Sequence, residues 1–598
     1  MSISLCMIVR NEQDNLARCL NSVKAIVDEM IIVDTGSKDD TVKIAESFGA
    51  KVYSFPWKDD FGEARNYSMK YASCDWILLM DADDELDASS HRQILELTGK
   101  DEAEAYFFKT VSYIGEKPGL DTLNNLNLRL VRNGRGYFFS NPIHEQIYSN
   151  ILRLNPSAKI VNLDIKIFHY GYLEKNIKGQ DKRKRNISIL EKELKLNPGY
   201  GFALFNLGNE YFASGSYLMA IENYEQAYSK FDPLQGYSSK LILKMVNCYM
   251  NIGRHDSALR LVEEGLGYYP EFTELEYFRA LIFFNQFKYT LAIKHFEKCT
   301  AMGESPLHLN MVEGAGTYRA DYLLGEIHFR LEDYKSSINY YEASISACRD
   351  FTPSLVKLYI SLCRDIKGSG PLEKGIAQLH KRHHLKMENT LLDILMQEKY
   401  YELTLRYITG MEKKSASNTS LIYRKSICRL MLKKYQEAFR LAGRLKADKE
   451  YEVKAVCLQA LCEALQNRTQ QAGKLLGECT SEAGEKLLKV YSAFILLLEG
   501  TGNMALSDDA NESAIFSAII FELLKILIGL HEFTVFEKAL GLLNMIDDKT
   551  VLLKLAKLYY GEGCYELAHQ ELVRSLKTFD AMDFEGADML MKLKARGL

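Results

Sequence analysis

The sequence has few of the residues that break or crosslink a chain. Its 598 residues include only ten prolines and two tryptophans, and its twelve cysteines form no C-x-x-C pair. Hydrophobic residues make up 47% and charged residues 26%, a composition that excludes a disordered, collagen-like or disulfide-stabilised protein. The cysteines are therefore expected to be reduced and mostly buried, as is usual in the cytoplasm.

Long apolar runs and an excess of one charge are also missing. No stretch approaches about 18 uninterrupted apolar residues, and the apolar segment at residues 1–10 is too short for a secretory signal. The 75 basic and 79 acidic residues nearly cancel, which argues against a protein that binds nucleic acid or a membrane surface as a whole. We therefore expect a cytoplasmic protein with no membrane span and no nucleic-acid partner.

Two regions of the chain differ in their hydrophobic period. Up to about residue 110, short apolar runs alternate with helical segments, which predicts an α/β domain with a mainly parallel sheet. From about residue 200 onward, helix pairs recur at about 34 residues, the period of tetratricopeptide repeats. The clearest copy has small and aromatic residues at the expected offsets: Leu207, Gly208, Tyr211, Gly215, Tyr217, Ala220, Tyr224 and Ala227. We expect roughly ten such pairs in a superhelix, with an irregular helical domain as the alternative for residues 350–550.

Acidic residues follow the apolar run at residues 76–80. Asp81 and Asp83 leave the end of this predicted buried strand, where two carboxylates can share Mg²⁺ or Mn²⁺. A solvated turn or a helix cap is the alternative interpretation of such a cluster. The ends of two earlier apolar runs, near Arg10 and Asp34, are expected at the same edge of the sheet, where functional groups collect in α/β domains.

Three other segments accompany the acidic one in a fixed order. They read IVRNE at residues 8–12, IIVDTGSKDDT at 31–41 and DFGEARN at 60–66. With the acidic segment they resemble the family-2 glycosyltransferases of the GT-A fold. The resemblance implies a GT-A domain at residues 1–190, followed by an all-α tetratricopeptide-repeat superhelix at 191–598. It also implies a metal ligand at Asp83 and a set of residues that bind the nucleotide sugar: Ile8, Arg10, Glu12, Asp34, Arg65, Asp81 and Ala82.

Two of these assignments have structural alternatives. Arg65 can instead form a surface ion pair with Glu63 or Asp60. Asp34 can serve as a cap at its strand end, and this role is compatible with binding the nucleotide. Many members of the family have a second aspartate where this chain has Thr35, which leaves the contact with the base open.

The segment from residue 126 to 186 narrows the resemblance. It reads LRLVR at 128–132, IHE at 143–145, FHYGY at 168–172 and KRKRN at 182–186, and it runs directly into the repeats. This succession is similar to bacterial glycosyltransferases with tetratricopeptide tails, of the sublancin S-glycosyltransferase and flagellin-glycosyltransferase type. The resemblance implies a protein or peptide as the acceptor of the sugar.

Glu145 is the candidate catalytic base in this segment. Sugar transfer with inversion needs a carboxylate within hydrogen-bond reach of the acceptor hydroxyl or thiol. A structural pairing of Glu145 with His144 or Arg132 is the alternative, and Asp84 and Glu85 are competing candidates for the base.

His169 and the basic run complete the predicted site. His169 is a candidate metal ligand, with a satisfied core histidine as the alternative. Lys182 and Arg185 are expected to bind the diphosphate of the nucleotide sugar, although a basic run is also typical of a solvated helix start.

The resemblance predicts a metal-dependent inverting glycosyltransferase, either a hexosyltransferase or an N-acetylhexosaminyltransferase. It would transfer a sugar from a UDP-sugar to a serine, threonine or cysteine side chain of an acceptor held by the repeats, with Mn²⁺ or Mg²⁺ as cofactor. The alternatives are a repeat scaffold with a non-catalytic nucleotide-sugar-binding domain, and a glycosyltransferase that acts on a glycan. The identities of sugar and acceptor, the linkage and homo-oligomerisation are left open.

Overall fold

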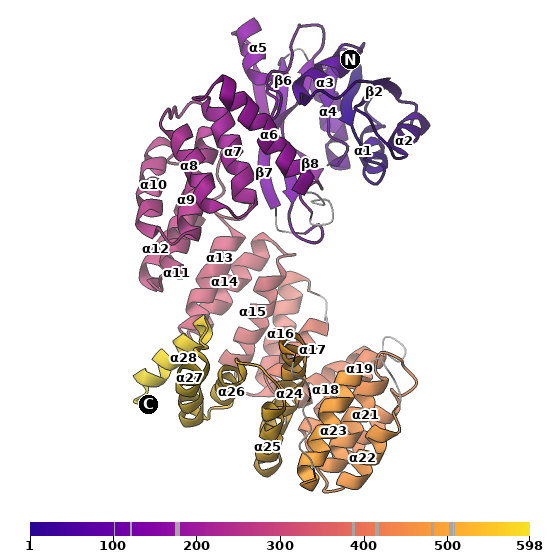
Figure 1. The fold of residues 1–598 in the computed structure, drawn as a ribbon, viewed down its shortest axis with the longest axis vertical. Coiled ribbons are helices and arrows are strands. Elements are labelled where there is room, and N and C mark those ends of the chain that lie inside the picture. Colours follow the sequence, from indigo (N-terminus) through magenta and orange to yellow (C-terminus); the bar gives the residue numbers. More distant parts are fainter. Residues whose placement is uncertain are drawn as a thin grey trace. The chain divides into compact units, whose positions relative to one another are not determined.

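The computed structural model describes residues 1–100, 102–119, 122–173, 180–385, 389–412, 418–479, 484–501, 506 and 509–598. The chain divides into two compact units, Met1–Ser361 and Leu362–Leu598. The first unit opens with a mixed α/β domain, and helices follow to the end of the chain (Figure 1). The predicted fold class, an α/β domain followed by an all-α repeat region, is confirmed. The division into residues 1–190 and 191–598 stays a prediction.

Eight strands form one sheet in the order β3-β2-β1-β4-β7-β6-β8-β5. Their bounds are β1 (Ile3–Val9), β2 (Glu29–Asp34), β3 (Lys51–Ser54), β4 (Trp76–Leu79), β5 (Asp84–Leu86), β6 (Ala105–Tyr113), β7 (Thr122–Arg132) and β8 (Ile160–His169). The first four strands pair in parallel, as predicted, and β7 joins β4 in the antiparallel direction. Because Val9 pairs with Asp34 and Cys6 with Leu79, the carboxyl ends of β1, β2 and β4 lie at one edge.

Helices cover both faces of the sheet because the side chains of its parallel strands are apolar on both faces. Leu5 and Met7 of β1 pack in one core cluster with residues of α1 (Leu16–Val23). Cys6, which points to the other face, contacts the backbone of α3 (Phe61–Met69). The other helices of this domain are α2 (Thr41–Ser47), η1 (Ala88–Ser90), α4 (His91–Thr98) and α5 (Tyr148–Leu154). Apolar packing therefore fills the layers, and polar groups are left at the strand ends.

Beyond the sheet, the helices of the first unit follow one another in pairs (Figure 1). They are α6 (Gln180–Leu196), α7 (Gly201–Ala213), α8 (Tyr217–Tyr228), α9 (Ser238–Asn251), α10 (His255–Tyr268), α11 (Thr273–Asn285), α12 (Tyr289–Met302), α13 (Tyr318–Arg330) and α14 (Tyr334–Ala347). Helix α15 (Thr352–Asp365) contains the boundary between the two units. Glycines allow the close pairing: a Cβ atom on Gly208 would lie 2.4 Å from the ring of Tyr224, and one on Gly325 would lie 2.5 Å from Tyr341. These are positions that the repeat pattern predicts.

Every extended element of secondary structure that is described in the second unit is a helix. Its elements are α16 (Ser369–His383), α17 (Asn389–Gln397), α18 (Tyr401–Glu412), α19 (Thr419–Met431), α20 (Tyr435–Gly443), α21 (Glu452–Ala464), α22 (Thr469–Gly477), α23 (Glu485–Glu499), α24 (Ala510–Gly529), α25 (Phe533–Ala539), η2 (Leu540–Met545), α26 (Val551–Gly561), α27 (Tyr565–Phe579) and α28 (Phe584–Ala595). The pairing becomes irregular at α24, which has 20 residues, and at α25, which has seven. For residues 350–550, both the predicted repeats and the alternative of an irregular helical domain stay predictions.

Two expectations about the whole chain can be compared with the described residues. All twelve cysteines are free, and eight of them are buried, as expected. Among the helices that the structure describes, none is long and apolar enough to cross a lipid bilayer.

The first repeats pack against the α/β domain within the first unit. Ile143 shares an apolar cluster with Ile189 of α6 and Leu207 of α7. Further along the repeats, Asn124 of β7 donates a hydrogen bond from Nδ2 to Oδ1 of Asn310 at 2.8 Å. The start of the repeat region therefore lies beside the edge of the sheet that carries the predicted site.

Candidate active site

Arg65 joins two carboxylates that the sequence assigns to different roles. Its Nη2 lies 2.6 Å from Oδ1 of Asp81, and its Nε donates to Oε1 of Glu145. Burial raises the pKa of Asp81, but the charges of Arg65 and of a second arginine hold this pKa well below its usual range. The alternative prediction for Arg65, a surface ion pair with Glu63 or Asp60, is wrong. Asp60 instead caps the start of α3, and Glu63 forms an ion pair with a lysine. One-third of the Asp81 side chain stays exposed, so this group is open to a ligand.

Arg129 is the second arginine, and the sequence analysis assigned it no role. It lies on β7, is 6% exposed and places its Nη1 3.3 Å from Oδ2 of Asp81 and 3.1 Å from Oδ2 of Asp84. An arginine within the apolar run LRLV is a signal that could have identified it, because a buried cation needs carboxylate partners.

Asp83, Asp84 and His169 form the only group of three potential metal-ligating side chains that the described residues bring together. Their ligand atoms lie within 4.8 Å of one another. The antiparallel pairing of β5 with β8 sets Asp84 opposite His169. As a result, Nδ1 of His169 lies 2.9 Å from Oδ1 of Asp84 and 3.4 Å from Oδ1 of Asp83.

Asp83 and His169 shift each other's pKa. Burial raises the pKa of Asp83 to about 6; His169 opposes this shift and the nearby aspartates reinforce it. Burial alone would lower the pKa of His169, but Asp83 and Asp84 raise it to about 9. In the absence of a cation, the imidazole therefore carries a proton near neutral pH. Histidine binds metals as the neutral imidazole, so a divalent cation bound here would displace that proton.

The backbone at Gly171 leaves a small space beside these side chains. A Cβ atom on Gly171 would lie 2.5 Å from Oδ2 of Asp83 and 2.6 Å from Nε2 of His169. Because Asp84 holds Nδ1 of His169, Nε2 is left to face the same space as the Asp83 oxygen. Carboxylate oxygen and imidazole nitrogen are donors that suit Mn²⁺, and a carboxylate behind the imidazole is a common outer partner. The residues at this position therefore fit a divalent cation.

Gly171→Ala is expected to reduce Mn²⁺-dependent binding of UDP by at least about tenfold, as calorimetric titration would show, because supporting residues of metal sites contribute this much. The added methyl group would occupy the space between Asp83 and His169. Gly410→Ala is the matched control, since a Cβ atom there meets no atom within 4 Å. Unchanged UDP binding by the Gly171 variant would remove this space from the site.

The ends of β1 and β2 carry the predicted nucleotide-binding residues. Both oxygens of Asp34 accept a hydrogen bond from the backbone N–H of Ser37 at 3.1 Å, so the predicted cap exists. Ile8 and Glu12 are half-buried and Arg10 is exposed. The structure therefore places these four residues at neighbouring strand ends.

The basic run opens helix α6, and the first repeat holds it in place. The guanidinium of Arg185 lies 5.1 Å from the ring centre of Phe61, and burial together with the charge of Arg10 lowers the pKa of Arg185. Glu210 of α7 accepts a hydrogen bond from Asn186 at 2.8 Å. The side chain of Lys182 lies outside the described residues, so its predicted role is not tested. The contribution of Glu210 was missed, because it depends on how α7 packs on α6.

The alternatives for Glu145 can be compared with these contacts. Arg132 is not its partner, because Arg132 donates to the carbonyl groups of residues 100 and 103. Among the competing bases, Asp84 is fully buried and bonded to Arg129 and His169, while Glu85 accepts a hydrogen bond from a tyrosine hydroxyl. Glu85 also lies 3.8 Å from Nε of Arg18, so each competitor has two partners, whereas the carboxylate of Glu145 is bonded to Arg65 alone among the described residues.

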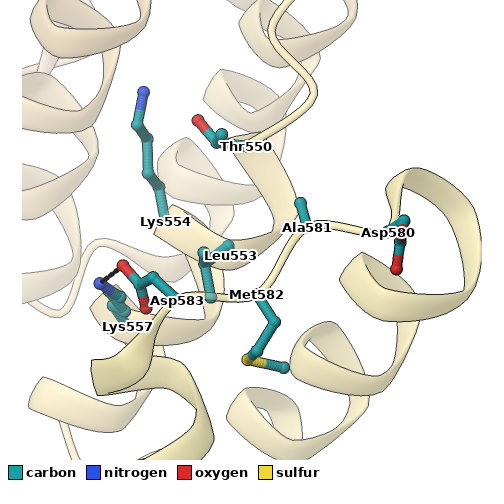
Figure 2. A pocket seen from close by; sticks show the side chains of 8 residues that line it. All are labelled: Thr550, Leu553, Lys554, Lys557, Asp580, Ala581, Met582 and Asp583. Carbon is teal, nitrogen blue, oxygen red and sulfur yellow. Dashed lines mark hydrogen bonds and ion pairs between the residues drawn. The ribbon is translucent and has the colours of Figure 1, made fainter. Parts of the chain in front are cut away.

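A separate depression lies in the second unit, beside α26 (Figure 2). It is lined by Thr550, Leu553, Lys554, Lys557, Asp580, Ala581, Met582 and Asp583. Its lysines are already paired, Lys554 with Asp548 at 2.8 Å and Lys557 with Asp583 at 2.6 Å. Both lysines of this depression are therefore already neutralised by carboxylates.

Comparison with known proteins agrees with this geometry. Residues 4–153 match the family described as Glycosyl transferase family 2, and residues 203–229 and 318–351 match the tetratricopeptide repeat. The chain is 37% identical over 210 residues to a TPR repeat-containing protein of Synechococcus elongatus. This match covers 34% of this chain and 51% of the relative. It is also 30% identical over 295 residues to the SPbeta prophage-derived glycosyltransferase SunS of Bacillus subtilis. This match covers 47% of this chain and 66% of the length of SunS.

An uncharacterized glycosyltransferase of Rickettsia felis is 32% identical over 177 residues, which are 28% of this chain and 62% of the relative. The chain thus spans between about half and two-thirds of the length of these relatives. The matched residues include β1, β2, β4 and Glu145, all of which contribute to the site described above. The α/β domain of this chain is therefore a family-2 glycosyltransferase domain of the GT-A fold, and tetratricopeptide repeats follow it.

Proposed function

We propose that the protein is a metal-dependent inverting glycosyltransferase that transfers a sugar from a UDP-sugar to a serine, threonine or cysteine side chain of a protein or peptide. The observation that carries the proposal is the position of Arg65 between Asp81 and Glu145 at the strand edge. The group formed by Asp83 and His169 follows directly on Asp81 in the same edge. Donor-binding groups and a candidate base are thus brought together.

The nucleotide would bind at the ends of β1, β2 and β4. Its contacts there would come from Ile8, Arg10, Glu12, Asp34, Asp81 and Ala82. Arg185 and Lys182 would bind the diphosphate from the side of α6. The mutual repulsion of Arg10 and Arg185 supports this role, because a diphosphate between two cations relieves it.

Asp83 and His169 would hold the divalent cation, with Asp84 orienting His169 from behind. A cation bound by these residues would supply positive charge that neutralises the departing diphosphate. Arg129 and Arg65 compensate the charge of Asp81, which is why a further anion can be accommodated next to this carboxylate. The proposed cation site and the arginine pair therefore serve the same leaving group.

Glu145 would act as the base. It would accept the proton of the acceptor hydroxyl or thiol while the oxygen or sulfur attacks the anomeric carbon of the sugar, and the bond to the diphosphate would break on the opposite face. One displacement of this kind inverts the configuration. Arg65 holds the carboxylate of Glu145 in a fixed orientation, which is needed for such a transfer.

The test of the donor site is a calorimetric titration of the full chain with UDP, with and without Mn²⁺. We expect binding that depends on Mn²⁺, and weaker binding of GDP as a control. A panel of UDP-sugars would then identify the donor by release of UDP. Absence of binding for every nucleotide would contradict the proposal and would favour a repeat scaffold with an inactive domain.

A further inference from the structure

Helix α28, the last helix that the structure describes, exposes apolar side chains on its outer face. Its inner face packs on the second unit, where Leu593 shares a core cluster with Leu553 of α26 and Leu572 of α27. On the outer face, spacings of three, four and four residues put one set of exposed side chains on the same side of the helix. This set, the apolar stripe, consists of Phe584, Ala587, Met591 and Ala595.

The apolar stripe is unusual for a helix in this position. Where the outer side of a repeat helix is not covered by another described helix, polar residues are normally found. In α28, by contrast, Phe584 is 51% and Met591 73% exposed. Two more apolar side chains, Leu576 (38% exposed) and Phe579 (37%), lie at the end of α27. Apolar groups gathered on a surface in this way indicate a contact with another protein surface.

The apolar stripe has the same pattern in both directions from Met591. A small residue lies four positions to each side, Ala587 before it and Ala595 after it. A second α28 that packs antiparallel about a two-fold axis at Met591 therefore sets Ala587 opposite Ala595 of the other copy. The small side chains let the two helices approach closely, and Phe584 and Met591 fill the space between them.

The charges beside the apolar stripe also fit an antiparallel second copy. Asp588 and Lys592 lie on the same side of the stripe, one before and one after Met591. They pair with each other at 3.3 Å, but their side chains stay 45% and 37% exposed. Antiparallel packing brings Asp588 of one copy beside Lys592 of the other. Parallel packing would bring like charges together, and charges that flank a helix pair decide its direction in this way.

We propose that the apolar stripe of α28 binds the same stripe of a second copy of this chain, with the two helices antiparallel about a two-fold axis at Met591. Each α28 has 12 residues and is about 18 Å long, so this helix pair lies at the lower end of interface sizes. We therefore expect a weak dimer that dissociates on dilution. The inference does not depend on the proposed activity, because the candidate active site lies in the other unit.

The experiment is sedimentation velocity of the full chain over a wide range of concentration. We expect the mass to rise from that of one chain towards that of two. Met591→Glu should raise the dissociation constant at least about tenfold, because it sets two carboxylates at the centre of the interface, where binding energy is concentrated. Met219→Glu is the matched control, since Met219 is also an exposed methionine on a helix, α8, and should leave the association unchanged.

A second set of variants tests the direction of packing. Asp588→Lys and Lys592→Glu should each weaken the association about threefold, the effect expected of exposed ion pairs, because like charges then meet across the antiparallel interface. An equal mixture of the two variants should associate more tightly than either alone, since opposite charges meet again. Both variants lack the ion pair within α28, so a change in the stability of the helix does not explain such a recovery.

Three results would overturn the inference. One is the mass of a single chain at every concentration, which would leave the apolar stripe to a different protein. Another is association that Met591→Glu does not weaken, which would place the contact elsewhere. The third is a mixture of the charge variants that associates no better than each variant alone. If Met591→Glu has a lower melting temperature than the wild type, the mixture decides the outcome, because both of its variants keep the apolar stripe.

Discussion

Asp83→Ala is expected to reduce Mn²⁺-dependent sugar transfer by at least about a hundredfold, the order of loss seen when one charge-stabilising group is removed. The substitution removes the oxygen that faces Nε2 of His169 across the space beside Gly171. It should not destabilise the chain. The folded-state pKa of Asp83 is raised to about 6, so the ionised carboxylate opposes folding above its unfolded pKa, and its loss removes this penalty at neutral pH.

The measurement for Asp83→Ala combines UDP release in the presence of an acceptor with calorimetric titration of UDP and thermal unfolding. Asp256→Asn provides the control, because Asp256 is an exposed carboxylate on the distant helix α10. A variant that unfolds like the wild type but transfers sugar at the normal rate would disprove the role of Asp83 as a metal ligand.

Glu145→Gln is expected to lower the rate of transfer by about 10²–10⁴, the usual contribution of a general base. Glutamine keeps an oxygen that can accept the hydrogen bond from Nε of Arg65, so the local structure should be retained. Because Asp81, Asp83 and His169 are unchanged, the affinity for UDP in the presence of Mn²⁺ should stay within about twofold. A large loss of turnover with little loss of donor binding is the signature expected of a base.

Glu85→Gln is the matched control for Glu145→Gln, since Glu85 is the competing carboxylate and accepts a hydrogen bond from Tyr170. We expect it to transfer sugar at close to the normal rate. The assignment would be reversed if the Glu85 variant lost turnover and the Glu145 variant kept it with the same acceptor.

Local patterns were sufficient for the buried parallel strands β1, β2 and β4 and for the clearest repeats, but not for the other five strands of the sheet. The unbroken apolar run at residues 76–80 predicts a strand buried on both faces, and β4 occupies residues 76–79. The acidic residues after it had to lie at the carboxyl edge of a parallel sheet, which is where Asp81 and Asp83 lie. In the repeats, a glycine and a tyrosine occur at the same offsets in different copies, because each helix pair repeats the same packing. The structure shows this contact between Gly208 and Tyr224 and again between Gly325 and Tyr341.

Local sequence patterns did not predict the contacts between segments that are distant in the chain. Arg65 and Glu145 are 80 residues apart, and nothing in either segment identifies the other as its partner. The expected surface pairs of Arg65 were wrong because α3 turns this side chain toward the strand edge, where a buried guanidinium requires carboxylates. Arg129 was overlooked for the same reason, since only the antiparallel pairing of β7 with β4 brings it to Asp81.

The sequence alone determined the class of each half, the edge of the sheet at which the chemistry is expected, and the resemblance to the family-2 glycosyltransferases. These properties follow from hydrophobic period and from short motifs, which act within a few residues of the chain. Only the tertiary structure decided which charges pair and that Gly171 leaves space beside Asp83 and His169. Such properties depend on strands and helices far apart in the chain, whose approach is set by the packing of the whole first unit.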